Sequence, residues 1–171
     1  RDRHSADLVC LLHQRQDSDS AGIAYVIDTP GDVSNPLFAF SVVGFSFLQT
    51  PVFTHELGHN FGCAHNREDA GSPNPGAANP GAYAYSYGYR FTGRDGVRYR
   101  TIMAYDSQTS PGIRRIAYFS NPDVEGPGGI GVPLGIMPGQ PGEAHNALTV
   151  TRTAFEVSAY RLGTEPPSPQ A

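Results

Sequence analysis

Three histidines and one glutamate lie close together in residues 55–65, at a spacing that suits a metal site. The stretch reads His-Glu-x-x-His-x-x-Gly-x-x-His, formed by His55, Glu56, His59, Gly62 and His65. Residues four apart share one face of an α-helix, one turn apart, so the first two histidines can direct their rings at one ion. Three protein ligands with an open fourth position are typical of catalytic zinc. The pattern therefore predicts a Zn²⁺ centre that can activate water.

The third histidine reaches the metal only if the helix ends before it. His65 lies six residues after His59, which places it about 240° further around an ideal helix. Gly62 lies between them, and glycine accepts the positive φ that ends a helix and reverses the chain. Glu56, directly after the first ligand, is then the predicted general base. The alternative is a surface helix that carries three histidines by chance, which a match at five specified positions disfavours.

The helix that carries this motif must be held by the elements before it. Thr50 suits the N-cap and Pro51 the first helical position of a helix that runs to about Phe61. Apolar runs that predict three strands precede it, at 6–12, 22–27 and 38–47, the last bulged at Gly44. A polar turn, 16–20, separates the first two runs.

After His65 the sequence changes to loop chemistry. Residues 66–81 are rich in Pro, Gly and Asn, and a loop of this length is usually functional or held by something. Calcium could hold it, although only Glu68 and Asp69 offer charge, so this support is weak.

Further elements follow the loop. Tyrosines alternate with small residues over 83–89, which predicts a strand with a packed aromatic face or, alternatively, a stacking platform for sugars or bases. A turn at 93–96 and a partner strand at 97–102 complete a predicted hairpin. A helix over about 143–162 ends at Gly163, and the Pro-rich stretch 164–171 reads as a tail or linker.

The composition bounds the remaining possibilities. A chain of 171 residues with 39% hydrophobic and 16% charged residues suits one globular domain. Together with the elements above, it predicts the α+β class. The net charge of −4 argues against a nucleic-acid surface, and no apolar run reaches the roughly 18 residues of a membrane span.

The two cysteines, Cys10 and Cys63, allow at most one disulfide. We favour the bridge, because an exposed free thiol beside a zinc site would be reactive, and two buried free thiols are the alternative. The sequence begins without a methionine or a signal peptide. The start at Arg1-Asp2-Arg3 looks cut from something longer, so we expect an upstream signal or pro-segment that is not part of the sequence.

Residues 55–65 together with Met103 resemble the metzincin metallopeptidases, whose signature is this extended motif plus a later methionine turn. Met103 stands in Thr-Ile-Met-Ala-Tyr, 38 residues after His65. The resemblance implies a small mixed twisted sheet and the active-site helix in an upper half, about 1–62. It implies a loop-rich lower half, about 63–163, with the Met-turn and a C-terminal helix. Met103 would form an apolar floor beneath the zinc, and Tyr105 would ligate zinc or hold the transition state, a packed tyrosine being the alternative.

More of the chain is similar to secreted bacterial and fungal peptidyl-Asp metallopeptidases and to reprolysin-like enzymes. The stretches that carry this similarity include 6–12, 22–26, 41–43, 87–90, 116–122 and 145–146. Asn66 departs from the pattern, since related enzymes often have Asp there. The resemblance implies that a substrate lies along an edge strand that includes Gly22, Ile23 and Ala24. It also implies that Arg114 or Arg115 pairs with a substrate aspartate, two solvated arginines being the alternative.

These features together predict a secreted zinc metalloendopeptidase, most simply a monomer, that acts on polypeptides. Two other classes stay open: a non-proteolytic zinc amidase, and a zinc-bearing binding module that no longer cleaves. An intact Glu56 argues against the second, because an inactive descendant has no chemical need for the base.

Overall fold

A computed structural model describes residues 1–14, 21–70, 79–109 and 111–161 of the chain. The predicted turn at 16–20 and the predicted tail at 164–171 lie outside the described residues, as do residues 71–78 of the predicted 66–81 loop. In the described part, two α-helices accompany three small sheets, which is compatible with the predicted α+β class. No described helix is long and apolar enough to cross a membrane.

The first sheet has the strand order β1-β3-β2. Strands β1 (Val9–His13) and β3 (Phe40–Gly44) run parallel, and β2 (Gly22–Ala24) pairs antiparallel with β3 and lies at the edge. All three fall within or beside the predicted apolar runs, and the mixed sheet is confirmed. The third strand is shorter than predicted, since the chain leaves it at Gly44 in a 3₁₀ turn, η4 (Phe45–Phe47), rather than in a bulge.

Helix α1 (Val52–Asn60) packs against β2 and β3. The predicted helix start is wrong by one residue, because Pro51 rather than Thr50 is the N-cap and the helix begins at Val52. The Thr50 hydroxyl still accepts a hydrogen bond of 3.4 Å from the backbone N–H of Val52. The helix stops as predicted, with Gly62 at a φ of +84°. This is the left-handed region that favours glycine.

Asn60 anchors the end of α1 to the sheet. Its side chain is fully buried. The amide nitrogen lies 2.7 Å from the carbonyl oxygen of Phe38 and 3.1 Å from those of Tyr25 and Phe40. These carbonyls flank β2 and β3, so one side chain fixes where the motif helix lies relative to both strands.

The second half of the chain forms two further sheets. Strands β4 (Ala64–Asn66) and β5 (Tyr87–Gly88) pair in parallel. Strands β6 (Arg90–Thr92) and β7 (Arg98–Arg100) form the predicted hairpin, and β8 (Arg114–Arg115) joins β7 in parallel. Short 3₁₀ turns η1 (Asp2–His4), η2 (Pro30–Asp32) and η3 (Pro36–Phe38) complete the N-terminal half.

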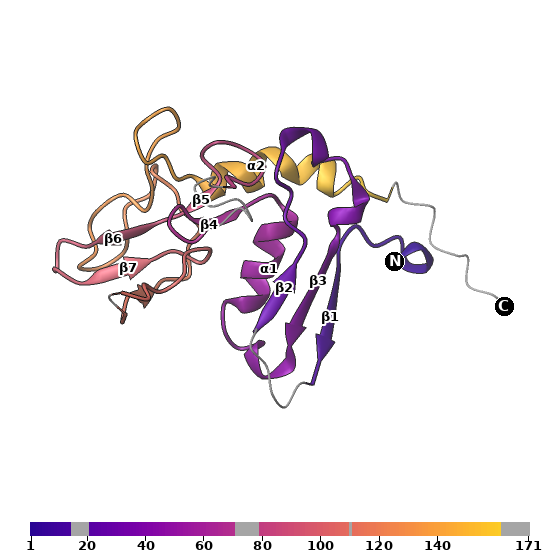
Figure 1. The fold of residues 1–171 in the computed structure, drawn as a ribbon, viewed down its shortest axis with the longest axis horizontal. Helices are drawn as coiled ribbons and strands as arrows, with labels where there is room; N and C mark the ends of the chain where they lie inside the picture. The colour runs from indigo at the N-terminus through magenta and orange to yellow at the C-terminus, as the bar shows by residue number, and fades with distance from the viewer. Residues whose placement is uncertain (15–20, 71–78, 110, 162–171) are drawn as a thin grey trace.

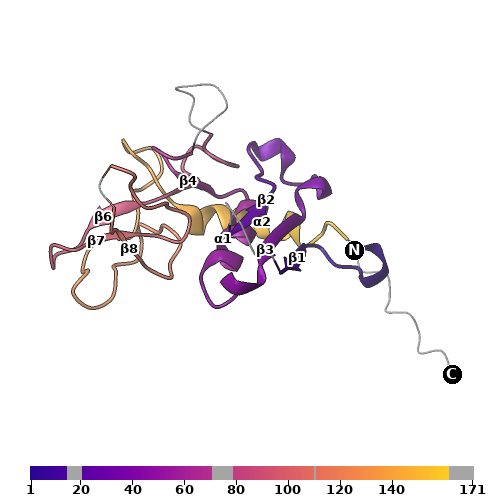
Figure 2. The ribbon, with the colours of Figure 1, turned by 60° about the horizontal axis from the view of Figure 1, so that its bottom comes forward.

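Helix α2 (Asn146–Val157) joins the two halves. The β1–β3 sheet lies at one end of the long axis and the β6–β7 hairpin at the other, with α1 between them (Figure 1, Figure 2). Val157 packs with Ile27 in one apolar cluster, and Val150 packs against Met103 in another. The helix is shorter than the predicted 143–162, and its predicted end at Gly163 lies outside the described residues.

The predicted strand over 83–89 is wrong except for Tyr87 and Gly88. Residues 81–85 form turns, closed by a backbone hydrogen bond from Ser86 to Tyr83 of 2.9 Å and by the Ser86 hydroxyl, which accepts from the Tyr83 N–H at 3.0 Å. Local serine bonds of this kind compete with strand pairing. The rings of Tyr83 and Tyr85 nevertheless stack, 5.3 Å apart.

The favoured disulfide is also wrong, because both cysteines are free. Cys10 lies on β1, whereas Cys63 is fully buried with Ile102 and Met103 beyond the end of α1. The Cys63 thiol donates to the carbonyl oxygen of Asn146, 3.7 Å away. Burial, rather than a bridge, keeps this thiol from reacting beside the metal site.

We expect Asn60→Ala to lower the free energy of unfolding by about 2–4 kcal/mol, because buried carbonyl acceptors lose their donor. Urea denaturation would measure this loss. Asn121→Ala serves as the control, since Asn121 makes a local bond to the backbone of Asp123 and should cost about 1 kcal/mol or less. Equal losses in the two variants would contradict the anchoring role of Asn60.

Candidate metal centre

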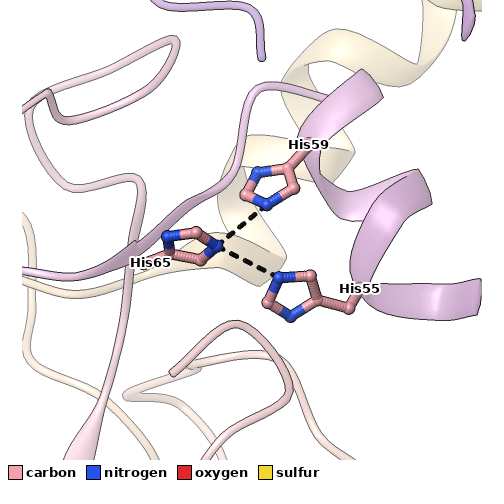
Figure 3. Close-up of side chains that lie close together, drawn as sticks. All are labelled: His55, His59 and His65. Atoms are coloured by element: carbon pink, nitrogen blue, oxygen red, sulfur yellow. Dashed lines mark hydrogen bonds between the residues drawn. The ribbon is translucent and has the colours of Figure 1, made fainter. Parts of the chain in front are cut away.

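Three imidazole rings meet where α1 ends and β4 begins. The Nε2 atom of His65 lies 3.1 Å from Nε2 of His55 and 3.0 Å from Nε2 of His59. Figure 3 shows the rings of His55 and His59 projecting from the helix toward His65 on the returning strand. The turn at Gly62 thus brings together the three histidines that the sequence pattern predicts.

The outer nitrogens of two rings are held by backbone carbonyls. Nδ1 of His55 donates to the carbonyl oxygen of Ile102 at 3.0 Å, and Nδ1 of His59 donates to that of Cys63 at 2.8 Å. With the hydrogens on Nδ1, both Nε2 atoms present lone pairs. His65 can supply one proton at most, so the neutral cluster leaves lone pairs facing one another, and a cation would satisfy them all.

The donor set fits zinc. Tetrahedral zinc with bonds of 2.0–2.1 Å to nitrogen separates its ligand atoms by about 3.3 Å, close to the distances observed here. Burial lowers the pKa of His55 and of His65 to about 4, and it lowers the pKa of His59 well below its ordinary value. The rings are therefore neutral at pH 7, as metal ligands must be. In the described part of the chain, this is the one cluster of His, Cys, Asp or Glu with metal-binding geometry.

Glu56 lies beside the histidines on the wall of an open cavity of about 320 Å³. Burial raises the pKa of its carboxyl group to about 7, because desolvation disfavours the charged form. A carboxyl group with such a pKa can both accept and release a proton near neutrality.

Met103 is fully buried directly against α1. A Cβ atom at Gly58 would lie 2.5 Å from the Met103 sulfur, so the methionine occupies space that a larger helical residue would fill. Gly58 lies between His55 and His59 in sequence, and Ile102, which holds the His55 ring, directly precedes Met103. The methionine is thus packed under the segment that carries two of the histidines.

The Tyr105 ring lies over the His65 ring, with centroids 4.0 Å apart. It is 43% exposed and lines the same cavity as Glu56. Burial, together with the carboxylates of Glu56 and Asp69, raises the pKa of the phenol, so it keeps its proton as a hydrogen-bond donor.

A polar network that the sequence reasoning missed fixes the Tyr105 backbone. The buried Asn66 side chain accepts from the Tyr105 N–H at 2.9 Å, and Arg90 donates from Nε to the Tyr105 carbonyl at 2.7 Å. Arg90 also pairs with Asp69, and Asn66 donates to both Glu68 and Asp69. The two carboxylates considered as calcium ligands are therefore engaged by protein donors. The sequence feature that could have indicated this network is Asn66, which stands where related enzymes often have Asp.

The edge strand β2 forms the other wall of the cavity. Gly22, Ile23 and Ala24 all line it, together with Ala64, His65 and Tyr105. The predicted substrate strand therefore borders the same space as the histidines.

The two candidate arginines differ in their surroundings. Arg114 is exposed, and it lies within electrostatic reach of Asp95 and Tyr99. Arg115 is partly buried, within electrostatic reach of His55 and Tyr105, and it pairs in register with Arg100. Its Nε atom is buried without a hydrogen-bond partner among the described residues. Of the two, Arg115 is the one that the structure brings near the metal centre.

Comparisons with known proteins identify similar proteins that are named as metalloendopeptidases. The peptidyl-Asp metalloendopeptidase of Stenotrophomonas maltophilia (strain R551-3) is 37% identical over 109 residues, 64% of this chain and 22% of the relative. That of Pseudomonas aeruginosa is 30% identical over 135 residues, 71% of this chain and 21% of the relative. The chain thus spans about a fifth of the length of these curated relatives.

A chain in the solved structure of a chaperone–substrate complex has a similar fold. It matches with a TM-score of 0.58 at 21% identity, over 95% of this chain and 22% of that one. The sequence pattern of Metallo-peptidase family M12 matches residues 1–120, a span that contains the histidine motif, the edge strand and Met103. The chain therefore belongs to metallopeptidase family M12.

Proposed function

We propose that this chain is the catalytic part of a secreted zinc metalloendopeptidase that hydrolyses peptide bonds in protein substrates. The observation that carries the proposal is the convergence of three Nε2 atoms, with Glu56 beside them on an open cavity. Membership of family M12 and the metalloendopeptidase names of the relatives support peptide bonds as the substrate. We also propose that the protein acts as a monomer and that a pro-segment precedes this part of it. The catalytic domain would consist of an upper half and a lower half that meet near residue 62.

The residues of the site divide the chemistry among them. His55, His59 and His65 would hold the zinc ion, which when bound lowers the pKa of water from 15.7 to about 7 and polarises the peptide carbonyl. Glu56 takes one proton from the attacking water on its carboxylate. As the C–N bond breaks, Glu56 gives that proton to the leaving amine nitrogen, which returns the carboxylate to its starting state.

Tyr105 and Met103 support this step in different ways. The Tyr105 phenol, held over His65 and protonated, donates a hydrogen bond to the oxygen that gains charge as water adds to the carbonyl. The Met103 thioether has no acidic proton and takes no part in proton transfer. It excludes water beneath α1 and packs against the segment that carries His55 and His59.

An extended substrate would bind along β2. This strand is the edge of its sheet and lines the cavity, so an extended peptide can lie alongside it as an added strand. Gly22, Ile23 and Ala24 would then align the scissile bond with the metal.

Arg115 would select an acidic residue directly after the scissile bond. A partly buried guanidinium beside a second arginine, with an unpartnered Nε in the described structure, favours an anionic ligand. The relatives are named for cleavage at aspartate. Arg114, on the opposite face of the strand, would not take part.

Casein hydrolysis tests the proposed activity. We expect a zinc chelator to abolish hydrolysis and added Zn²⁺ to restore it, because the water and the carbonyl lose their activating ion. Zinc-dependent cleavage of an amide substrate without any cleavage of casein or peptides would instead support the amidase.

Glu56→Gln is the matched control for this experiment. We expect it to bind one equivalent of zinc, since the three ligands remain, and to lose at least about 10³-fold in kcat because the proton acceptor is gone. Near-normal turnover would contradict the role of Glu56, and a wild-type protein that binds zinc and peptide without cleavage would be a binding module.

Paired substitutions of the two arginines test the selectivity. We expect Arg115→Gln to reduce the preference in kcat/KM for an Asp over an Asn peptide by roughly 10- to 100-fold, the loss of one charge-assisted hydrogen bond. Arg114→Gln should leave the preference unchanged. A wild-type preference for apolar residues, or equal effects of both substitutions, would contradict the assignment.

A further inference from the structure

Gly22 lies directly against the carboxyl group of Glu56. A Cβ atom at Gly22 would lie 2.5 Å from Oε1 and 2.8 Å from both Cδ and Cγ of Glu56. Real Cβ contacts essentially never fall below 3.0 Å, so any residue other than glycine requires this carboxyl group to move.

The backbone gives no other reason for a glycine at this position. Gly22 is absent from the positive-φ residues of the chain, so an L-residue can adopt its conformation. It opens β2 in regular antiparallel pairing with Val43. The constraint on Gly22 is therefore the space that Glu56 occupies.

An alanine at this position would move the carboxyl group at little cost to the fold. The obstructing atoms belong to the end of a flexible side chain, and Glu56 borders an open cavity of about 320 Å³ into which that end can turn. Backbone contacts of α1 and β2 need not change.

We propose that Gly22 is a positioning residue for the general base: its missing side chain leaves the space in which the Glu56 carboxylate is held beside the three histidines. The proposal rests on the proposed function for its catalytic consequence, and on geometry alone for the position of the carboxylate. It gives Gly22 a role through Glu56, separate from any backbone contact of β2 with substrate.

Gly22→Ala tests this role. We expect kcat on a peptide substrate to fall roughly 10- to 100-fold, since a displacement of about 1 Å can cost this much. Zinc content and the midpoint of thermal unfolding should stay at wild-type values. Gly31→Ala is the matched control, because Gly31 also lacks a positive φ and its added Cβ would meet only the Thr29 hydroxyl oxygen, at 3.7 Å. Wild-type kcat in Gly22→Ala would overturn the proposal.

The Glu56→Gln background separates this role from a direct effect on substrate. Gly22→Ala should cause no further loss of residual kcat there, because the base that the methyl group displaces is already absent. A further loss of residual kcat in the double variant would show that the methyl group acts other than through the base and would overturn the proposal.

Crystal structures provide a readout independent of turnover. We expect the Glu56 carboxylate of Gly22→Ala to turn into the cavity, whereas an unmoved carboxylate would overturn the proposal. If the wild-type protein cleaves no peptide, the proposed function fails, while these structures still decide the positional claim.

Discussion

The meeting of three imidazole nitrogens, with Nε2 of His55 and of His59 each about 3 Å from Nε2 of His65, is the constraint on which the rest of this structure depends. Two of the rings are locked by carbonyl acceptors at their outer nitrogens, so their lone pairs must face the third ring. Neutral lone pairs at this separation repel unless a cation lies between them. One of the locking carbonyls belongs to Cys63, between Gly62 and His65 of the motif, and the other belongs to Ile102, far along the sequence. The metal centre therefore requires both halves of the chain to be in place.

Close approach by small residues assembles the surroundings of the site. Gly58 admits the Met103 sulfur against the helix, and Gly22 admits the Glu56 carboxyl group against the edge strand. Neither glycine has a positive φ, whereas Gly62 does. Glycine thus serves two physical purposes within one site: it reverses the chain once, and it clears space for functional side chains twice. The flexible side chains of Met103 and Glu56 fill the space that Gly58 and Gly22 leave open. The residues around the histidines can therefore pack densely without distortion of the backbone.

Short-range patterns in the sequence predicted the parts of the site that local geometry determines. The helix, its end at Gly62 and the convergence of the histidines follow from the helical period and one glycine. The hairpin follows from its turn. The strand predicted over 83–89 failed because Ser86 closes a local turn that an alternation pattern cannot reveal. The disulfide failed because the two cysteines lie in different parts of the fold. The hydrogen bonds from Asn66 and Arg90 to the Tyr105 backbone link distant segments of the chain. The different surroundings of the two arginines also depend on such contacts, so no local pattern could predict either feature.

Anomalous diffraction from crystals grown with zinc, measured on both sides of the zinc absorption edge, tests whether the three histidines hold zinc. We expect one anomalous peak at full occupancy, about 2.0–2.1 Å from the Nε2 atoms of His55, His59 and His65, with Glu56 outside the coordination sphere. A peak elsewhere, or a zinc ion held by only two of these histidines, would contradict it.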